Sequence, residues 1–293
     1  MSSLTEYPCD VCGGDAAAEI EVARHYTGDR PLHVCKNCGF VYVRLRRDLA
    51  DITGAWAKYV FGDTFEDGKY TARIPAVKAR HIYVAEFIDT TVGLRDKSLC
   101  DIGAGEGVFL QMLTKDYGAR PFGVEPSAEN CEAMRAAGIA CFHGMIEDYL
   151  AAPECRSGGF DLASIVWALE NTGSCRGMMA GARRLLRTGG QLTVATSSRI
   201  LVPFKKPMHY FLNPLAPDLH PFFFSANALR NLFAAAGFAV RHVNRYIDTD
   251  YLVMAGEALE RPEAAPPAKD DWREVVDFFR RWHEDTRDHY AGS

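Results

Sequence analysis

Four cysteines form two closely spaced pairs near the N-terminus. Cys9 and Cys12 lie in "YPCDVCGG", and Cys35 and Cys38 lie in "HVCKNCGF"; in each pair two residues separate the cysteines and a glycine follows the second. This spacing lets two thiolates bind one ion, and two such pairs supply the four sulfur ligands that a structural zinc ion prefers. The sequence therefore predicts one structural Zn²⁺ held by all four cysteines.

A structural role is favoured over a catalytic one for this ion. Catalytic zinc sites keep an open position and usually include a histidine or carboxylate ligand. His25 and His33 lie nearby, but neither is needed to complete a set of four. The stretch between Cys12 and Cys35 is long enough for a short hairpin such as "AEIEVARHY". A segment this small cannot bury a core of its own, so a metal ion would replace one.

A second chemistry-bearing stretch is the glycine-rich turn "LCDIGAGEGVFL", which begins at Leu99. Gly103, Ala104 and Gly105 follow the strand-like run "SLCDI" and precede a helix expected to begin near Val108. Such a strand-to-helix turn brings bare backbone amides and a helix N-terminus close to a ligand. The dinucleotide fingerprint G-x-G-x-x-G would need a glycine where Val108 stands, so the turn does not fit a dinucleotide.

Acidic residues around the turn indicate the charge of its ligand. Asp101 and Glu106 flank the glycines and would repel a pyrophosphate, but they suit a ligand with an ammonium and a sulfonium. Glu125 in "GVEPS" follows the next expected strand, where a carboxylate can accept hydrogen bonds from both hydroxyls of an adenosine ribose. The pattern favours a cationic cofactor that carries an adenosine.

These motifs resemble a known family. "DIGAGEGVFL" followed by "GVEPS" resembles motifs I and II of class I S-adenosylmethionine (SAM)-dependent methyltransferases. "FDLASIVWALENT", "ARRLLRTGGQLTVATSS" and "HPFFFSANALRNLFAAAGF" resemble later parts of that core in the same order, so the resemblance covers Asp96 to about Leu259. The cysteine pairs ahead of such a core resemble the subfamily that acts on nucleotide-linked sugars and related small molecules.

The resemblance implies a set of cofactor-binding residues. They are Asp101, Gly103 and Gly105 at the methionine end, Glu125 at the ribose, Met145 and Ile146 beside the adenine, and Trp167 at the floor of the site, with Ala104 and Pro126 of the same motifs also expected to bind the cofactor. An ordinary core role stays equally open for Met145, Ile146 and Trp167, and Glu125 could instead be a solvated strand end.

The catalytic residues follow the family pattern less closely. Methyl transfer needs an in-line nucleophile, and a hydroxyl acceptor benefits from a general base. The family often places a histidine after the glutamate that follows the fourth strand, whereas this chain has Asn171 after Glu170. The departure disfavours methylation of carbon and favours oxygen or nitrogen. His220 in "DLHPFFFS" is the predicted replacement base, with Glu170 and Tyr70 as further catalytic candidates.

Two loops contain other candidates, for which an ordinary loop role stays open. His209 and Tyr210 lie in "RILVPFKKPMHYFLNPLAPD", whose length suggests a lid. Lys205 and Lys206 of the same loop could meet a phosphate of a nucleotide sugar. Tyr59 lies in the aromatic, glycine-rich stretch "AWAKYVFGDTFEDGKYTARIP", which we expect to cover the site.

Strands that alternate with helices must position these residues. Helices are expected at "AVKARHIYVAEF", after the glycine turn, in "RRLLRTGG", from Ser127 to Gly138, and from Ser225 to Gly237. Only "IDTD" separates the strand "FAVRHVNRY" from "YLVMAGEAL", so the final strands must form an antiparallel hairpin. The sequence predicts an α/β fold, a doubly wound, mostly parallel, Rossmann-like methyltransferase sheet with an antiparallel last strand.

The pattern divides the 293 residues into four parts. They are a zinc-binding segment at 1–48, a helical and aromatic cover at 49–95, a SAM-binding core at 96–260, and a linker with a C-terminal amphipathic helix at 261–293. The apolar residues of that helix recur with a helical period at Trp272, Val275, Val276, Phe279 and Trp282. We expect this stripe to dock on its own chain near the N-terminal cover, or on a second subunit as a homo-oligomer contact.

Composition sets further bounds on the function. The net charge of −5 argues against a broad nucleic-acid surface, although it leaves room for a local basic patch. No apolar run is long enough to span a bilayer, and "MSSLTEYPCD" lacks the features of a signal peptide. The five cysteines outside the two pairs are scattered singly, which indicates a reducing compartment. We therefore expect a cytoplasmic protein that has no membrane partner.

The sequence as a whole predicts a zinc-containing SAM-dependent methyltransferase of the EC 2.1.1 class. The expected acceptor is a small molecule, a sugar or a nucleotide-linked sugar, methylated on oxygen or nitrogen. One alternative is an RNA methyltransferase that binds through the zinc segment and through Arg44, Arg46 and Arg47 of "YVRLRRD". The other is a binding module that keeps the SAM fold without its chemistry.

Overall fold

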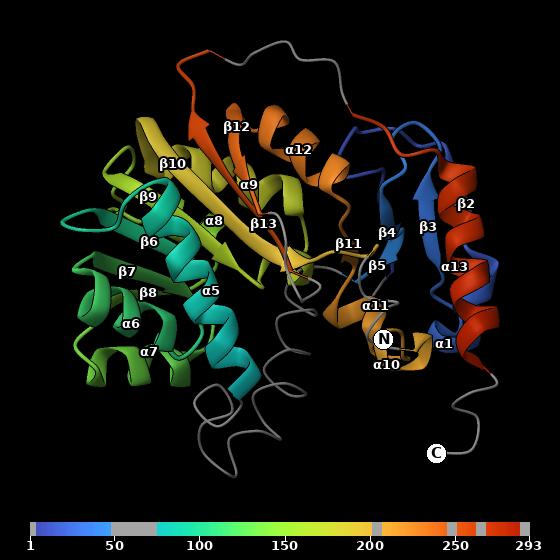
Figure 1. The fold of residues 1–293 in the computed structure, drawn as a ribbon, viewed down its shortest axis with the longest axis horizontal. Helices are drawn as coiled ribbons and strands as arrows, with labels where there is room; N and C mark the ends of the chain where they lie inside the picture. Colours follow the sequence, from blue (N-terminus) through green and yellow to red (C-terminus); the bar gives the residue numbers. More distant parts are fainter. Residues whose placement is uncertain (1–3, 48–74, 201–206, 245–250, 262–267, 288–293) are drawn as a thin grey trace.

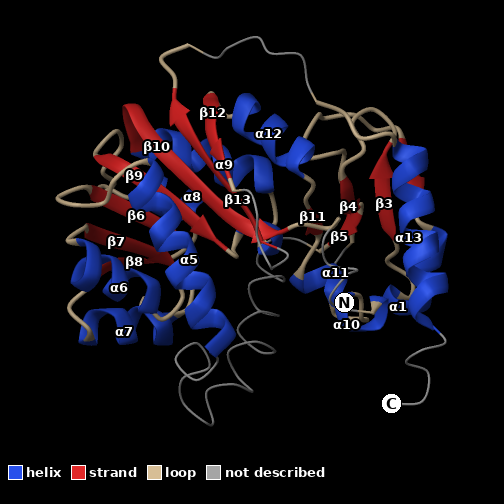
Figure 2. Ribbon diagram, in the orientation of Figure 1, coloured by secondary structure: helices blue, strands red, loops and turns tan. Residues whose placement is uncertain are grey.

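Two β-sheets organise the protein, one in each half of the molecule (Figures 1 and 2). The structure is a computed structural model that describes residues 4–47, 75–200, 207–244, 251–261 and 268–287. The larger sheet has seven strands and the smaller one has four. A short pairing of β1 (Thr5–Glu6) with β5 (Leu45–Arg46) accompanies the smaller sheet.

The large sheet has the strand order β12-β13-β10-β9-β6-β7-β8. Its strands are β6 (Ser98–Ile102), β7 (Arg120–Glu125), β8 (Ala140–His143), β9 (Phe160–Val166), β10 (Leu186–Ser197), β12 (Phe238–Val243) and β13 (Tyr251–Ala258). All neighbours pair in parallel except β13, which is antiparallel to both β10 and β12. The predicted mostly parallel sheet with an antiparallel last strand is confirmed.

Helices cover both faces of this sheet. They are α5 (Pro75–Thr91), α6 (Val108–Tyr117) and α7 (Ala128–Ala136) on one face, and α8 (Ile146–Ala151), α9 (Cys175–Leu185) and α12 (Ala226–Ala235) on the other. Ser127 and Ser225 cap α7 and α12 as expected, because each hydroxyl accepts a hydrogen bond from the backbone N–H three residues on. None of the described helices is long and apolar enough to cross a bilayer.

One boundary differs from the expected pattern. The helix predicted to end within "RRLLRTGG" stops at Leu185, and β10 begins directly at Leu186. The register of β10 against β9 shifts between Leu186 and Gln191, so the glycines of this stretch belong to an irregular part of the strand.

The small sheet has the order β11-β4-β3-β2, and all its pairs are antiparallel. Its strands are β2 (Ala17–Glu19), β3 (Leu32–Cys35), β4 (Val41–Val43) and β11 (Phe222–Phe223). The hairpin expected within "AEIEVARHY" does not form there. Its first strand is present as β2, but the residues that follow form two helical turns, η1 (Glu21–Ala23) and α1 (Arg24–Thr27). The strand that pairs with β2 is β3, beyond those turns.

The fourth strand of the small sheet comes from a distant part of the chain. β11 begins two residues after His220 and pairs with β4, so that Phe222 lies opposite Tyr42 and Phe223 lies opposite Val41. The backbone N–H of Val43 also donates a hydrogen bond to the carbonyl of Pro221 at 2.8 Å. The N-terminal segment and the large sheet are thereby joined through the loop that carries His220.

The C-terminal helix α13 (Trp272–Arg287) packs on the small sheet (Figure 1). Val275, Phe279 and Trp282 are at most 4% exposed and share a core cluster with residues of β3 and β4. Two shorter helices, α10 (Met208–Phe211) and α11 (Ala216–Leu219), lie between β10 and β11 in the chain. Met208 of α10 belongs to the same core cluster. The helix therefore docks on its own chain, and its partner is the sheet of the N-terminal segment.

Asp270 anchors the segment that leads into α13. Its carboxylate accepts hydrogen bonds from Arg199 at 2.7 Å, from Ser225 at 2.5 Å and from Asn227 at 2.7 Å. Its backbone N–H donates to the carbonyl of Cys38 at 3.2 Å. Because the Arg199 side chain is only 4% exposed, this is a largely buried ion pair, and breaking one partner of such a pair is costly.

Candidate active site and metal centre

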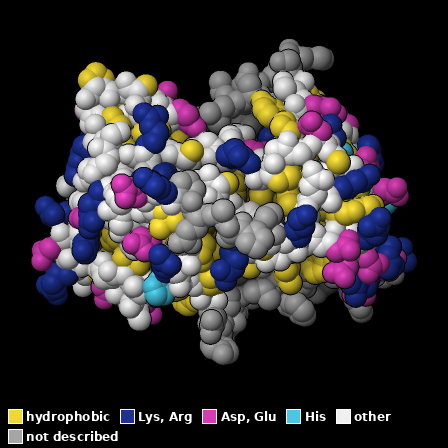
Figure 3. Space-filling view, turned by 90° about the horizontal axis from the view of Figure 1, so that it is seen from above, with side chains coloured by type: hydrophobic (Ala, Val, Ile, Leu, Met, Phe, Trp, Pro, Cys, Tyr) yellow, Lys and Arg dark blue, Asp and Glu magenta, His cyan; other side chains and the backbone are white. Residues whose placement is uncertain are grey.

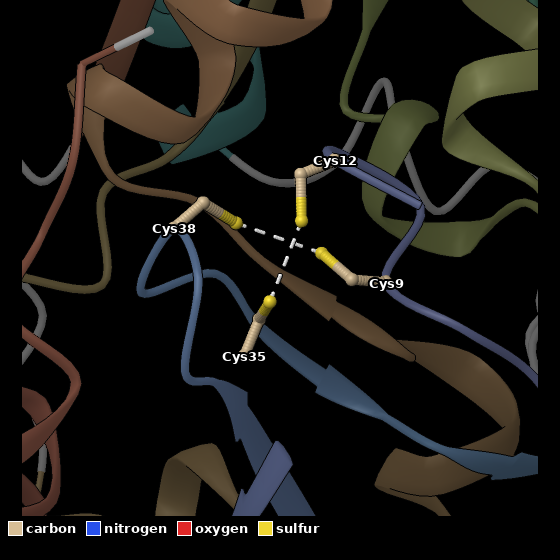
Figure 4. A group of neighbouring side chains, drawn as sticks. All are labelled: Cys9, Cys12, Cys35 and Cys38. Carbon is tan, nitrogen blue, oxygen red and sulfur yellow. Dashed lines mark hydrogen bonds between the residues drawn. The ribbon is translucent and has the colours of Figure 1, made fainter. Parts of the chain in front are cut away.

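The four N-terminal cysteines converge on one point (Figure 4). The sulfur atoms of Cys9 and Cys38 are 3.6 Å apart, those of Cys12 and Cys35 are 3.5 Å apart, and all four lie within 4.8 Å of one another. A tetrahedral zinc ion with Zn–S bonds of ~2.3 Å separates its sulfurs by about 3.8 Å, whereas a disulfide bond would bring them to about 2.05 Å. The sulfur positions fit a four-thiolate metal site.

Local backbone geometry builds the two halves of this site. Gly13 and Gly39, which follow the two pairs, both have φ of +75°, and each donates a backbone hydrogen bond to the first cysteine of its pair. Only glycine adopts this conformation without strain. The contacts with Cys35 and Cys38, and after them burial, raise the pKa of the Cys9 thiol, and a metal ion bound here would displace its proton.

The glycine turn joins β6 to α6 and leaves one backbone position open. Gly103, Gly105 and Gly107 have φ of +78°, +56° and +74°. A Cβ on Gly103 would lie 2.6 Å from the Cβ of Ala168, and one on Gly107 would collide with Met134, so packing requires both glycines. A Cβ on Gly105 would meet no atom within 4 Å. The space over Gly105 is where a ligand can approach bare backbone.

Glu125 holds the turn from the end of β7. Its carboxylate is 3% exposed and accepts hydrogen bonds from the backbone N–H of Gly105 at 2.9 Å, from that of Ser127 at 3.0 Å and from the Asn130 amide at 3.2 Å. Burial raises the pKa of Glu125, and these donors oppose that rise. A carboxylate offers about four acceptor positions, so it keeps capacity for a ribose hydroxyl.

Asp101 lies buried in β6, beside Glu125. It is 2% exposed and accepts a 2.6 Å hydrogen bond from the Ser164 hydroxyl. Burial and the charge of Glu125 together raise the pKa of Asp101 to about 7. A cation bound near two such carboxylates would favour their ionised forms, which agrees with the positively charged cofactor expected from the sequence.

The residues expected near the adenine lie at neighbouring strand ends but differ in exposure. Met145 is half-buried, and its backbone N–H donates to Asp148 at 2.9 Å. Ile146 is 2% exposed, and its side chain packs against Gly181 of α9, which corresponds to the core role that the sequence left open. The carbonyl of Pro126, just beyond β7, contacts the His143 ring at 3.1 Å.

Trp167 follows β9 in a strained backbone conformation. Its φ is +52°, a value that costs energy in any residue with a side chain. The Arg80 guanidinium stacks on the indole at 5.0 Å, and Tyr251 meets it edge-on at 5.1 Å. Within the described part of the chain, the buried indole N–H has no hydrogen-bond partner. Sequence reasoning missed Arg80 and Tyr251, because neither belongs to a motif.

The structure brings His220 to the segment that carries Glu170 and Asn171. That segment is the short helix η3 (Leu169–Asn171), which follows the Ala168 packed against Gly103. The Asn171 amide nitrogen donates to the Trp167 carbonyl at 2.8 Å, and its oxygen lies 2.5 Å from Nδ1 of His220. Because that oxygen can only accept, Nδ1 must donate, and neutral His220 then carries its lone pair on Nε2.

Glu170 belongs to the same short helix, and its carboxyl points away from solvent. It accepts a hydrogen bond from the Thr196 hydroxyl at 3.0 Å. Burial raises its pKa from 4.5 to about 7, and hydrogen bonds from its own backbone N–H and from Thr196, followed by the charge of Arg80, oppose part of that rise. At neutral pH the carboxyl is therefore divided between its protonated and ionised forms.

This raised pKa predicts a pH-dependent stability difference for Glu170→Gln. Between pH 4.5 and 7 the unfolded chain ionises Glu170 while the folded chain keeps its proton, so the free energy of unfolding falls as pH rises. The amide cannot ionise and still accepts from Thr196. From pH 5 to pH 8 we expect the variant to gain about 2.5 kcal/mol relative to wild type. Urea unfolding at both pH values measures this difference, and an equal difference at the two would contradict the prediction.

Of the other candidates in the loops, the structure describes the side chain of His209. His209 lies on α10, which packs against α13 and the small sheet. Tyr59, Tyr70, Lys205 and Lys206, together with the side chain of Tyr210, lie outside the described residues.

The arginines that favoured the RNA alternative are engaged within the protein. Arg46 is 1% exposed, pairs with Asp10 at 2.9 Å and stacks on Tyr7 and Phe222. Arg47 pairs with Asp218 at 3.3 Å, and Arg44 pairs with Glu6 at 3.4 Å. On the face drawn in Figure 3, basic and acidic side chains are interspersed. These three arginines therefore do not form the basic patch that the alternative required.

Comparison with known proteins identifies the family. The family model described as a methyltransferase domain matches residues 77–243, which is more than half of the chain. The protein therefore belongs to this methyltransferase family, and together with its seven-stranded sheet this confirms the predicted SAM-dependent methyltransferase. A search of curated protein sequences gave no significant match.

Solved structures share the fold at low sequence identity. The 1,6-didemethyltoxoflavin-N1-methyltransferase of Burkholderia thailandensis is 16% identical, with a TM-score of 0.56, over 84% of this chain and all of that one (100%). A methyltransferase of Haloferax volcanii in complex with the Trm112 activator is 18% identical, with a TM-score of 0.51, over 71% of this chain and 98% of the other. The CurJ carbon methyltransferase is 15% identical, with a TM-score of 0.51, over 70% and 61%. At these identities the likeness establishes the fold alone.

Proposed function

We propose that this methyltransferase methylates an oxygen or nitrogen atom of a small molecule, a sugar or a nucleotide-linked sugar. The contact between His220 and Asn171, beside Glu170, carries the proposal. The resemblance noted above places a histidine after the glutamate, and here asparagine holds an imidazole that arrives from a distant loop. In this arrangement a histidine side chain still lies next to position 171, but it comes from position 220 of the chain.

SAM fits the residues around the glycine turn. The open space over Gly105 would receive its amino-acid part, Asp101 would lie beneath it, and Glu125 would accept from the ribose. Pro126 and Met145 at the neighbouring strand ends would flank the adenine, with Ile146 behind them. When bound, the cofactor supplies a methyl group on a sulfonium, which a nucleophile can displace.

His220 acts as the general base in this proposal. Nε2 accepts the proton of an acceptor hydroxyl or amine, and the Asn171 oxygen stabilises the resulting imidazolium through Nδ1. Glu170, with a pKa near 7, would add negative charge beside that cation as it ionises. A carbon acceptor would instead need prior deprotonation to an enolate, for which the family's own histidine position is lost.

The N-terminal segment has a positioning role in the same proposal. Its four cysteines would hold one structural zinc ion, and its sheet includes β11, which begins two residues after the base. Arg30 of this segment forms a buried ion pair with Asp218, two residues before His220. The metal site, the ion pair and the strand pairing together would fix the loop that presents the imidazole.

Substitution of His220 tests the base. With an acceptor identified by screening nucleotide-linked and free sugars against labelled SAM, we expect His220→Ala to lower kcat by about 10²–10⁴-fold. The affinity for S-adenosylhomocysteine should not change, because His220 lies outside the glycine turn. His209→Ala is the matched comparison, since it removes the rival histidine of the same loop and should leave kcat within about twofold.

Two outcomes would count against the proposal. A kcat that survives His220→Ala but collapses in His209→Ala would transfer the role of base to the rival. Methyl transfer to RNA, with no transfer to any sugar of the screen, would overturn the acceptor class.

A further inference from the structure

A second cavity lies far from the glycine turn, between the metal centre and the edge of the large sheet. It has a volume of about 720 Å³ and is bounded by the cysteine turns at Cys12 and Cys38, by α12 and by β12. In the strand order β12-β13-β10-β9-β6, four steps separate β12 from the strand that feeds the glycine turn. At ~4.8 Å a step, this corresponds to about 19 Å. The cavity is therefore distinct from the cofactor site.

Among the described residues that line this cavity, all the charged side chains are cationic. They are Arg176, Arg230, Arg241 and Lys269. Such a gathering is unusual in a chain with a net charge of −5. Like charges around one hollow repel one another, so their proximity points to an anion that would occupy it.

Three of the four cations form no ion pair within the described residues. Arg176 donates to the backbone carbonyls of Asp10 and Val11, at 2.8 and 2.6 Å, while the Asp10 carboxylate, which attracts Arg176 at longer range, pairs with Arg46. Arg230 and Lys269 form no ion pair within the described residues. Arg241 is the exception, because it pairs with Glu257 at 3.0 Å. The cavity thus presents three cations that form no ion pair within the part of the chain that the structure describes.

We propose that this cavity binds a small molecule that carries a diphosphate. A diphosphate monoester has about three negative charges at neutral pH, since its terminal phosphate contributes −1.5 to −2. Guanidinium groups match phosphate oxygens with paired donors. Val11, Phe238 and Val240 supply an apolar lining beside the cations, where the organic part of the ligand would pack. The cavity volume is typical of small-molecule sites.

Calorimetric titration of the zinc-loaded full chain with inorganic pyrophosphate tests the site. S-adenosylhomocysteine is kept saturating, so that the cofactor site is filled if it binds there. We expect pyrophosphate to bind at least about tenfold more tightly than inorganic phosphate, because only the diphosphate spans several cations. The double variant Arg230→Gln/Lys269→Gln should lose at least about tenfold in that affinity. Both side chains are exposed and unpaired in the described structure, so their loss should not disturb folding.

Arg135→Gln is the matched control, because it removes one exposed charge from α7 at the other end of the large sheet. It should leave pyrophosphate affinity unchanged. The proposal is overturned if pyrophosphate does not bind, or if the double variant binds it as well as wild type. It is also overturned if a short RNA competes more tightly than pyrophosphate and loses its affinity in the double variant, since the cavity would then belong to a nucleic-acid surface.

Discussion

Gly105→Val is expected to abolish binding of S-adenosylhomocysteine while the chain keeps its fold. A Cβ at this position meets no protein atom within 4 Å, so the side chain would fill the space that a ligand needs against the backbone. The φ of +56° adds backbone strain of about 1–3 kcal/mol, which a domain of this size should tolerate. Calorimetry measures the affinity, and thermal unfolding measures the fold.

Gly138→Val separates the ligand effect from the strain. Gly138 follows α7 with φ of +77°, and a Cβ there also meets nothing within 4 Å, but the position lies away from the glycine turn. This control should lose similar stability and keep its affinity. Wild-type affinity in Gly105→Val would remove the cofactor site from the turn, and equal loss in both variants would attribute the effect to folding.

Removal of zinc is expected to have the largest effect on stability. The purified protein should carry one zinc ion per chain, and binding to four thiolates is worth about 10–16 kcal/mol in small zinc domains. Without it, the small sheet should loosen first, because Cys35 lies in β3 and Cys38 accepts the backbone hydrogen bond from Asp270 that precedes α13. Metal analysis and hydrogen exchange of the zinc-free protein measure both effects.

The structure also predicts how far this disturbance travels. Loss of the small sheet should release β11, and methyl transfer should fall with it, because β11 follows His220. Binding of S-adenosylhomocysteine should persist, since the glycine turn belongs to the large sheet. Cys155→Ser removes a thiol outside the cluster and should change neither property. A zinc-free protein with unchanged exchange in β3 and α13 would show that the ion does not support this segment.

Local patterns determined much of the framework. Ser98–Ile102 formed the expected strand, α6 began at Val108, and Ser127 and Ser225 capped their helices. Each of these features depends on residues within one or two turns of the chain, such as a hydroxyl that reaches an N–H three residues away. The convergence of the two cysteine pairs was also predictable from the sequence, because the spacing within each pair is typical of residues that bind one ion.

Only the tertiary structure decided which distant segments meet. The pairing of β4 with β11, the seat of α13 on the small sheet, and the contact of His220 with Asn171 join parts of the chain that no periodicity links. Arg46 appeared to be a surface charge in its sequence context, yet it lies buried between Asp10 and Phe222. The free energy of such contacts depends on shape, burial and charge across two surfaces at once, and one segment alone contains neither partner's geometry.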